Sequence, residues 1–361
     1  MPEPSRILAL NCGSSSLKFG VYSGEKLLLE GEAEEIGLPE AGFWWRAGER
    51  KEKQQPIADH AAAFELVRRT VADAGLSALD AVGHRVVHGG PKLRDHFLLN
   101  ENALQDLKAA VPFAPLHLPS SIAVIDAVSK LLGKLPQIIC LDTAFHKDLP
   151  DVSKTLPLSR AVREQGVQRY GFHGLSVESI VAQLETLPDR MVVAHLGNGS
   201  SLTALLRGKS IDTTMGLTPS GGVMMGTRCG DIDPGALLFL MRQGMDADRL
   251  ESLVDHESGL QGVSEKTSDV RELSKARATD AKSDLALRMF TYQVKKAIAG
   301  MAAALGGLDS LVFTGGIGEH AEAVRNEICN GLAFLGQFEA RTLPAQEDLQ
   351  ISRIAGRLLA G

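Results

Sequence analysis

Short apolar runs alternate along the chain with longer stretches whose apolar residues recur at helical spacing. Between residues 60 and 74, Phe64, Val67 and Val71 recur every three to four positions, as on one face of a helix. The alternation predicts an α/β protein. The predicted strands are 6–10, 19–22, 26–30, 81–87, 137–141, 191–196, 202–206 and 311–314, and the predicted helices are 60–74, 101–110, 120–132, 176–184, 236–243, 283–304 and 322–332.

One polar loop occurs twice in this pattern, about half a chain apart. LNCGSSSL (10–17) and LGNGSSL (196–202) each follow a predicted strand, and each is followed by a second strand, a turn and a third strand. Hairpin loops are often rich in Gly, Asn and Ser for backbone reasons alone, but the repeated order favours two duplicated domains. Glycine turns and serine hydroxyls are donors suited to phosphate-sized anions.

Composition narrows the class of protein. A chain of 361 residues predicts about two domains. The net charge is −6 with basic and acidic residues interspersed, which favours neither a nucleic-acid partner nor an anionic membrane. The four cysteines form no CxxC pair, and the N-terminus has no signal-peptide pattern, so we expect a cytoplasmic protein. The most apolar long stretch, 297–308, is too short to span a bilayer.

Common nucleotide and hydrolase motifs do not account for the chain. There is no G-x-x-x-x-G-K-[ST] loop, no zinc-ligand spacing and no G-x-S-x-G elbow. GIGEHA (316–321) follows a predicted strand as a dinucleotide fingerprint would, yet too little chain remains after it for the rest of a Rossmann sheet. It is better interpreted as a nucleotide-contacting loop of another α/β fold.

Histidines and arginines gather in short segments at the ends of predicted strands. Six of the ten histidines lie in HRVVHGG (84–90), APLHLP (114–119), LDTAFH (141–146), RYGFHG (169–174) and AHLGNGSS (194–201), and MGTRCGDIDPG (225–235) adds Arg228. Each residue alone also has an ordinary interpretation: Arg85 as a surface charge, His173 as a buried structural histidine. Asp142 ends an apolar strand, where a carboxylate is costly unless paired or metal-bound. Together these groups fit phosphoryl transfer, which needs positioning and charge neutralisation.

These strings, with DTTMGLTP (212–219) and FTGGIGE (313–319), closely resemble the acetate kinase family over residues 7–350. The resemblance implies an α/β fold of two duplicated ribonuclease-H-like domains, of the actin-like and sugar-kinase ATPase type, around a central nucleotide cleft. We expect an N-terminal domain of residues 1–146 to which 347–361 return as a helix. A C-terminal domain, 147–346, would carry most of the nucleotide site.

The resemblance also implies roles for individual residues. The expected catalytic residues are Arg85, Asp142, His173 and Arg228. Substrate would contact Arg85, Val87, Leu116, His117, Phe172 and Pro219. The nucleotide would contact His195, Leu196, Gly197, Asn198, Gly199, Asp269, Val270, Arg271, Gly316, Ile317, Gly318, Glu319 and His320. Asn11 and Glu347 would serve the metal.

The implied reaction is reversible, Mg²⁺-dependent transfer of the ATP γ-phosphoryl group to acetate, giving acetyl phosphate and ADP by direct in-line transfer. Mn²⁺ is an alternative metal, and a homodimer with no nucleic-acid or membrane partner is expected. A propionate or butyrate kinase would use the same groups, because one methylene changes binding by only ~1–3 kcal/mol. A nucleotide-binding member of the superfamily without kinase activity is a further alternative. A sugar kinase would need a general base, and only Asp142 offers one.

The chain departs from the family's motifs at several positions. Leu118 replaces Asn in APLHNP, Leu175 and Val177 replace Thr and His in GFHGTSH, and Cys229 replaces Ser. His320 replaces Asn in GIGEN. None of these positions is among the four expected catalytic residues, so the departures bear on acid preference and rate.

Overall fold

The structure is a computed structural model that describes residues 5–361; the first four residues of the expected N-terminal domain lie outside it. The described chain divides into two compact units. Unit 1 contains the residues up to Lys147 together with 174–179 and 346–361, and unit 2 contains 148–173 and 180–345. The C-terminal segment therefore packs with the N-terminal part of the chain.

Unit 1 is built on an eight-stranded sheet of order β5-β4-β3-β2-β1-β6-β8-β7. Its central strands β1, β6 and β8 are parallel, and the remaining neighbours pair antiparallel. The strands are β1 (Arg6–Cys12), β2 (Leu17–Ser23), β3 (Lys26–Glu34), β4 (Gly42–Ala47), β5 (Glu49–Gln54), β6 (Ala81–Val86), β7 (Phe97–Leu98) and β8 (Gln137–Leu141).

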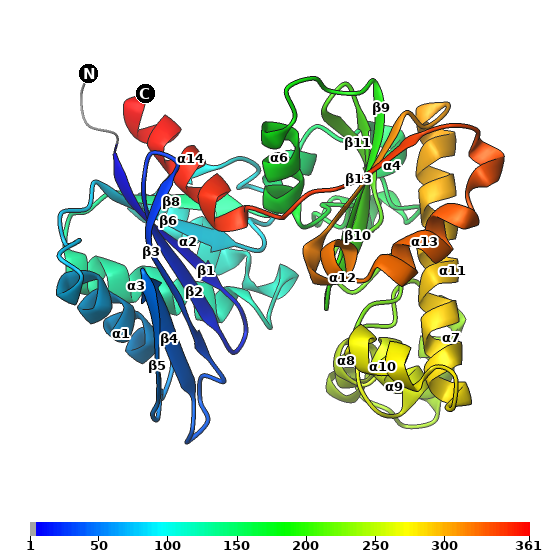
Figure 1. The fold of residues 1–361 in the computed structure, drawn as a ribbon, viewed down its shortest axis with the longest axis horizontal. Helices are drawn as coiled ribbons and strands as arrows, with labels where there is room; N and C mark the ends of the chain where they lie inside the picture. Colours follow the sequence, from blue (N-terminus) through cyan, green and yellow to red (C-terminus); the bar gives the residue numbers. More distant parts are fainter. Residues whose placement is uncertain (1–4) are drawn as a thin grey trace. The chain divides into compact units, whose positions relative to one another are not determined.

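Alternating apolar residues of β1 bury both faces of this sheet. Leu8 and Leu10 join a core with α1 (His60–Asp73) and α3 (Leu118–Leu132), whereas Ile7 and Ala9 pack with α14 (Glu347–Ala360). Successive side chains of a strand point to opposite faces, so an unbroken apolar run is the expected sequence of a strand covered on both sides. Figure 1 shows α1 and α3 on one face and α14 on the other.

Unit 2 is built on a five-stranded sheet of order β11-β10-β9-β12-β13. The strands are β9 (Arg190–Leu196), β10 (Ser200–Leu206), β11 (Lys209–Thr213), β12 (Ser310–Thr314) and β13 (Glu339–Thr342). The long helix α11 (Ala281–Leu305) covers one face, where Phe290, Val294 and Ile298 meet alternate residues of β9 and β10 (Figure 1).

The two sheets repeat one topology. In each, the first strand pairs antiparallel with the second, and the second pairs antiparallel with the third. On its other side the first strand pairs parallel with a later strand, β6 in unit 1 and β12 in unit 2, and in the described chain only unit 1 has the extra hairpin β4–β5 between them. A further parallel strand follows in both, β8 in unit 1 and β13 in unit 2. The strand–loop–strand–turn–strand pattern that the sequence repeats is therefore present once in each sheet, as β1–β2–β3 and as β9–β10–β11.

Every predicted strand and helix has a counterpart within a few residues. The sequence pattern did not indicate β4, β5, β7 or β13, nor the helices at 151–154, 160–163, 247–256, 259–264, 270–276 and 315–320. The remaining helices are α2 (Glu101–Ala109), α4 (Asp151–Lys154), α5 (Arg160–Arg163), α6 (Gly174–Gln183), α7 (Pro234–Arg242), α8 (Ala247–His256), α9 (Gly259–Ser264), α10 (Val270–Ala276), α12 (Gly315–His320) and α13 (Glu322–Asn330).

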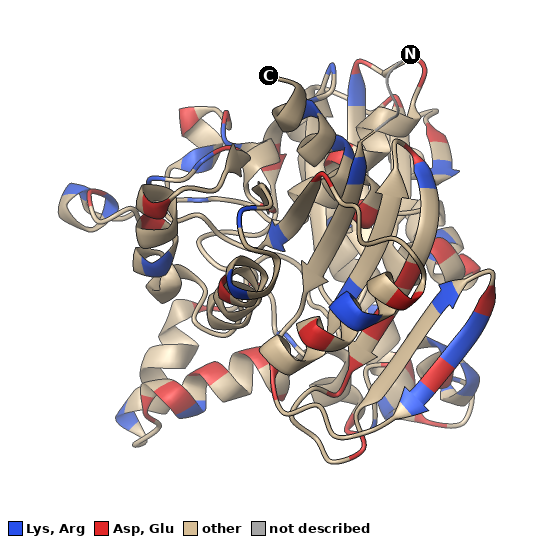
Figure 2. Ribbon diagram, turned by 90° about the vertical axis from the view of Figure 1, so that its left-hand side faces the viewer, with Lys and Arg blue, Asp and Glu red and all other residues tan. Residues whose placement is uncertain are grey.

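The distribution of charged and apolar residues in the structure is as the composition led us to expect. Figure 2 shows basic and acidic residues interspersed along the helices and strands. Over residues 5–361, no helix combines the length and apolar character that crossing a membrane requires.

Candidate active site

Three expected site residues lie at the carboxyl ends of the parallel strands of unit 1. Asn11 on β1 pairs in register with Arg85 on β6, and Asp142 directly follows β8. The Asp142 amide donates to the Val86 carbonyl at 3.0 Å, which holds the residue beside the end of β6. Adjacent parallel strands end at one edge of a sheet, and such an edge is where α/β proteins place ligands.

Arg85 joins the other two side chains. Its Nε and Nη2 both donate to Oδ2 of Asp142, at 2.9 and 2.6 Å, and its Nη1 donates to Oδ1 of Asn11 at 3.1 Å. The planar guanidinium thereby uses three donors in fixed directions, which a lysine cannot do. Both bonds to Asp142 fall on one oxygen. The other, buried Oδ1 has no hydrogen-bond partner among the described residues.

The first turn of α14 completes this cluster. Nδ2 of Asn11 donates to Oε2 of Glu347 at 3.1 Å and to Oδ1 of Asp348 at 3.2 Å. Glu347, to which the family resemblance assigns a metal role, thus lies beside Asn11 although more than three hundred residues of chain separate them. Asp348 was not expected. Two adjacent acids in the first turn of a helix are common for capping reasons, so nothing in the sequence marked it.

Burial and neighbouring charge act against each other in this cluster. Burial raises the pKa of Asp142 and outweighs the Arg85 charge, which acts to lower it. For Arg85, burial acts to lower the pKa, but the charges of Asp142 and Glu347 raise it above its ordinary value. Burial, followed by the charge of Glu347, raises the pKa of Asp348 to about 6. A further cation would relieve this crowding of carboxylates.

The donor set of unit 1 fits Mg²⁺ in one of its usual modes. Within residues 5–361 no three His, Cys, Asp or Glu side chains are placed to enclose a metal ion by themselves. Mg²⁺ commonly takes only one or two protein carboxylates and fills its remaining positions with water and substrate phosphate. The unpartnered Oδ1 of Asp142 and the carboxylates at Asn11 are hard oxygen ligands of that kind.

A second cluster lies within unit 2 at the β9–β10 hairpin. The imidazole rings of His173 and His195 stack with centroids 4.1 Å apart and planes 15° from parallel. Nδ1 of His173 lies 2.9 Å from Oγ of Ser201, the residue opposite His195 in the strand pair. Arg228 lies at the same hairpin, and its Nη1 donates to the Pro219 carbonyl at 3.3 Å.

The glycine of the hairpin turn leaves space for these groups. A Cβ atom at Gly199 would lie 3.3 Å from Nε2 of His173 and 3.4 Å from Nη1 of Arg228. The turn also holds the arginine segment, because the Gly226 amide donates to the Asn198 carbonyl at 3.0 Å. An imidazole nitrogen and a guanidinium thus approach one spot beside a glycine turn, which suits an anion.

Other expected nucleotide residues have structural contacts of their own. The Leu196 side chain is in the apolar core, so only its backbone can face a ligand. Asp269 caps α10 by accepting from the Arg271 amide at 2.8 Å, and Val270 is buried. Gly197 belongs to the turn, where its amide donates to the Gly199 carbonyl at 3.0 Å.

The expected glycine loop after β12 differs in form from the prediction. Residues 316–320, which are Gly316, Ile317, Gly318, Glu319 and His320, are not an open turn but belong to α12 itself. Gly315 takes the positive φ of 76° that the direction change requires. Oε1 of Glu319 accepts from the amides of Gly315 and Ala345, both at 3.1 Å.

The remaining residues expected to contact the substrate are divided between the units. Val87, Leu116 and His117 belong to unit 1, whereas Phe172 and Pro219 belong to unit 2. Val87 and Phe172 are buried, and Leu116 is exposed. His117 is the residue directly before α3.

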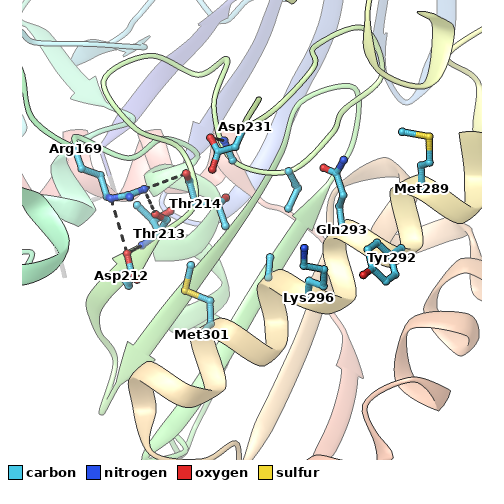
Figure 3. A pocket seen from close by; sticks show the side chains of 13 residues that line it. Arg169, Asp212, Thr213, Thr214, Asp231, Met289, Tyr292, Gln293, Lys296 and Met301 are labelled. Carbon is cyan, nitrogen blue, oxygen red and sulfur yellow. Dashed lines mark hydrogen bonds and ion pairs between the residues drawn. The ribbon is translucent and has the colours of Figure 1, made fainter. Parts of the chain in front are cut away.

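A groove of about 690 Å³ lies elsewhere on unit 2, between α11 on one side and the end of β11 with the residues that follow it on the other. Figure 3 shows Asp212, Thr213 and Thr214 facing Gln293, Lys296 and Met301 of α11. Its Arg169 donates to the carbonyls of Thr213 and Thr214 at 2.6 and 3.0 Å. None of the expected site residues lines this groove.

The sequence of this chain is similar to those of known proteins over most of its length. The sequence profile of the Acetokinase family matches residues 6–348. The chain belongs to this family. An acetate kinase of Clostridium botulinum is 41% identical over 349 residues, covering 92% of this chain and 88% of the relative.

Solved structures agree. The acetate kinase of Porphyromonas gingivalis superposes with a TM-score of 0.89 at 33% identity, over 98% of this chain and 100% of its own. A propionate kinase of Francisella tularensis gives 0.92 at 33% identity, over 97% and 98%. The predicted fold class, two duplicated ribonuclease-H-like domains of the actin-like ATPase type, is confirmed by these neighbours and by the two sheets.

Proposed function

We propose that this protein is an acetate kinase, which transfers the γ-phosphoryl group of ATP to acetate and runs the reverse reaction from acetyl phosphate and ADP. Membership of the acetokinase family over nearly the whole chain carries this proposal. We expect the chain to act through the residues around Arg85 in unit 1 and those around Arg228 in unit 2.

In the proposed forward reaction a carboxylate oxygen of acetate forms a bond to the γ-phosphorus of ATP. The bond from that phosphorus to the β,γ-bridging oxygen breaks, and ADP leaves with the electron pair. Acetate is already an anion at neutral pH, so no general base is needed. The obstacle is repulsion between anions, which positioned cationic donors overcome.

The residues of unit 1 are proposed to hold the acceptor and the metal. Arg85, fixed by Asp142 and Asn11, has the orientation-locked guanidinium that a carboxylate or phosphoryl oxygen requires. Mg²⁺, when bound with nucleotide, supplies neutralising charge to the phosphates. Asn11, Asp142 and Glu347 would hold it, with Mn²⁺ as the alternative ion.

The residues of unit 2 are proposed to bind phosphate and nucleotide. Arg228 and His173 supply donors beside the glycine turn of residues 197–199. The segments 269–271 and 316–320 are proposed to contact the adenosine, and His195 to Gly199 the ATP phosphates. Val87, Leu116, Phe172 and Pro219 are proposed to surround the methyl group of the acid, with His117 nearby.

We further propose a homodimer formed through unit 2. Leu238, Phe239 and Met241 on α7 are each at least half exposed. Adjacent large apolar side chains on one short helix are typical of an interaction surface. The four cysteines are all free thiols, which supports a reducing, cytoplasmic location.

A substrate panel tests the proposed function. The purified protein is incubated with ATP, Mg²⁺ and acetate, propionate or butyrate, and acyl phosphate is trapped as hydroxamate. We expect acetate to give the highest kcat/KM. Propionate is included because a similar solved structure is a propionate kinase. A higher kcat/KM for propionate would change the proposed substrate but not the proposed reaction. Absence of acyl phosphate with all three acids would overturn the proposal.

A further inference from the structure

Ser201 is a buried serine beside the His173 ring and is not among the individual site residues expected from the sequence. Its side chain lies on β10 directly opposite His195 of β9, and the residue is 1% exposed. Its Oγ lies 2.9 Å from Nδ1 of His173. The stacked His195 ring fixes the plane of the His173 imidazole. The contact with Ser201 fixes how the ring is turned within that plane.

The chemistry of the hydroxyl indicates the direction of the hydrogen bond. The Ser201 side chain makes no second hydrogen bond to a described residue. If Nδ1 carried the ring hydrogen, the buried Ser201 O–H would be left without an acceptor, which is costly in an interior. If Ser201 donates instead, Nδ1 accepts and the ring hydrogen lies on Nε2.

Nε2 is the nitrogen that faces the ligand side of the cluster. It lies beside the space at Gly199 that Nη1 of Arg228 also borders. His173 has a left-handed backbone, with φ of 58°, which a non-glycine residue adopts only when its surroundings hold it. The ring is therefore held from three directions: by its backbone, by His195 and by Ser201.

We propose that Ser201 is a positioning residue for the phosphoryl-transfer reaction. Its hydroxyl donates to Nδ1 of His173, so the ring presents an Nε2–H donor beside Arg228 to an anionic phosphoryl oxygen. This inference deepens the proposed function and rests on it, but its structural half concerns only the tautomer of His173.

The tautomer can be measured on the unmodified protein. Long-range ¹H–¹⁵N spectra of protein with ¹⁵N-labelled histidine report which ring nitrogen carries the hydrogen, and His173→Gln assigns the signal. We expect the Nε2–H tautomer in the wild type and a mixture in Ser201→Ala. An Nδ1–H tautomer of His173 in the wild type would overturn the proposal.

Kinetics of a matched pair separates orientation from packing. Ser201→Thr keeps a hydroxyl. Valine has nearly the same shape as threonine but no hydroxyl, so Ser201→Val differs from Ser201→Thr chiefly in lacking the hydrogen bond. We expect kcat for acyl phosphate formation to fall about 10- to 100-fold in Ser201→Ala and Ser201→Val, the range typical of losing a group that orients a functional side chain. KM for ATP should change little, and Ser201→Thr should recover most of kcat.

Thr203→Val is the control, because Thr203 is a buried hydroxyl on the same face of β10 whose Oγ1 lies 3.3 Å from that of Thr213. It should keep the wild-type kcat. Wild-type kcat in Ser201→Val, or equal losses in Ser201→Thr and Ser201→Val, would contradict the inference. A wild type that makes no acyl phosphate would refute the proposed function instead, and the spectra would still decide the tautomer.

Discussion

Asn11, Arg85 and Asp142 could be picked out from the sequence because each is a polar residue at the end of an apolar strand. Their mutual contacts follow from strand register, since residues ending adjacent parallel strands must lie side by side. Ser201 and Asp348 could not be found in this way. Ser201 resembles any serine of a hairpin, and Asp348 acquires its contact with Asn11 only because α14 packs against β1.

Gly199 offers a test at the scale of a single atom. Its Cβ would crowd Nε2 of His173 and Nη1 of Arg228, at 3.3 and 3.4 Å. We expect Gly199→Ala to lower kcat for acyl phosphate formation about tenfold or more while the protein stays folded. Gly300→Ala on α11, where a Cβ meets no atom within 4 Å, is the control for kinetics. Equal activity in both variants would show that the space at Gly199 is not used.

His84 is a histidine of the HRVVHGG segment that proves structural. It is buried, and its Nε2 lies 2.8 Å from Oε1 of Gln137. Burial lowers the pKa of His84 to about 4, so the folded state binds the proton less readily than the unfolded state, whose pKa is about 6.5.

The free energy of unfolding should therefore fall as the pH drops from about 6.5 toward 4, with His84 contributing about 3 kcal/mol of the loss. We expect His84→Gln to flatten this part of the curve in urea unfolding series. A variant curve that runs parallel to the wild type between pH 6.5 and 4 would exclude His84 as a contributor.

At the scale of elements, α14 links the end of the chain to the candidate site. It packs on the sheet through Ile351, Ile354 and Ala355, and its first turn carries Glu347 to Asn11. The contact with β6 is close because Gly83 has no side chain: a Cβ there would lie 2.5 Å from Cγ2 of Ile351.

Gly83→Ala should therefore force α14 outward and lower the free energy of unfolding by about 1–3 kcal/mol, as overpacking typically does. Because Glu347 moves with the helix, the concentration of Mg²⁺ needed for half-maximal activity should also rise. Gly356→Ala is the matched change on α14, where a Cβ meets open space, and should stabilise the helix by about 0.5–1 kcal/mol. An unchanged unfolding midpoint for Gly83→Ala would contradict the packing described.

The elements that the sequence did not reveal lack the apolar alternation on which prediction depends. β5 reads ERKEKQ and is exposed at every position. β13 reads EART, and its one partly buried residue, Arg341, pairs with the buried Val312 of β12. Both are edge strands that exist because a neighbouring strand offers unpaired backbone groups. Charged residues along β5 are typical of an edge that must not pair with another chain.

At the scale of the whole chain, the duplication was the feature most accessible to sequence. It was visible because two glycine and serine loops begin the same order of strands, and the two sheets repeat that order. Strand neighbours beyond each hairpin were not indicated by periodicity, since they depend on which strands lie together after folding. The assignment of roles to the two loops came from the family resemblance and not from the repeat.

The central claim is that Arg85 in unit 1 and Arg228 in unit 2 are both required for phosphoryl transfer to a carboxylate. The most direct measurement is hydroxamate-trapped acetyl phosphate from wild type, Arg85→Ala and Arg228→Ala, with ATP binding measured by calorimetry in parallel. We predict that each variant loses at least about 100-fold in kcat, as removal of a donor to transition-state charge typically causes, while Arg228→Ala still binds ATP. Near-wild-type acetyl phosphate formation by either variant would contradict the account.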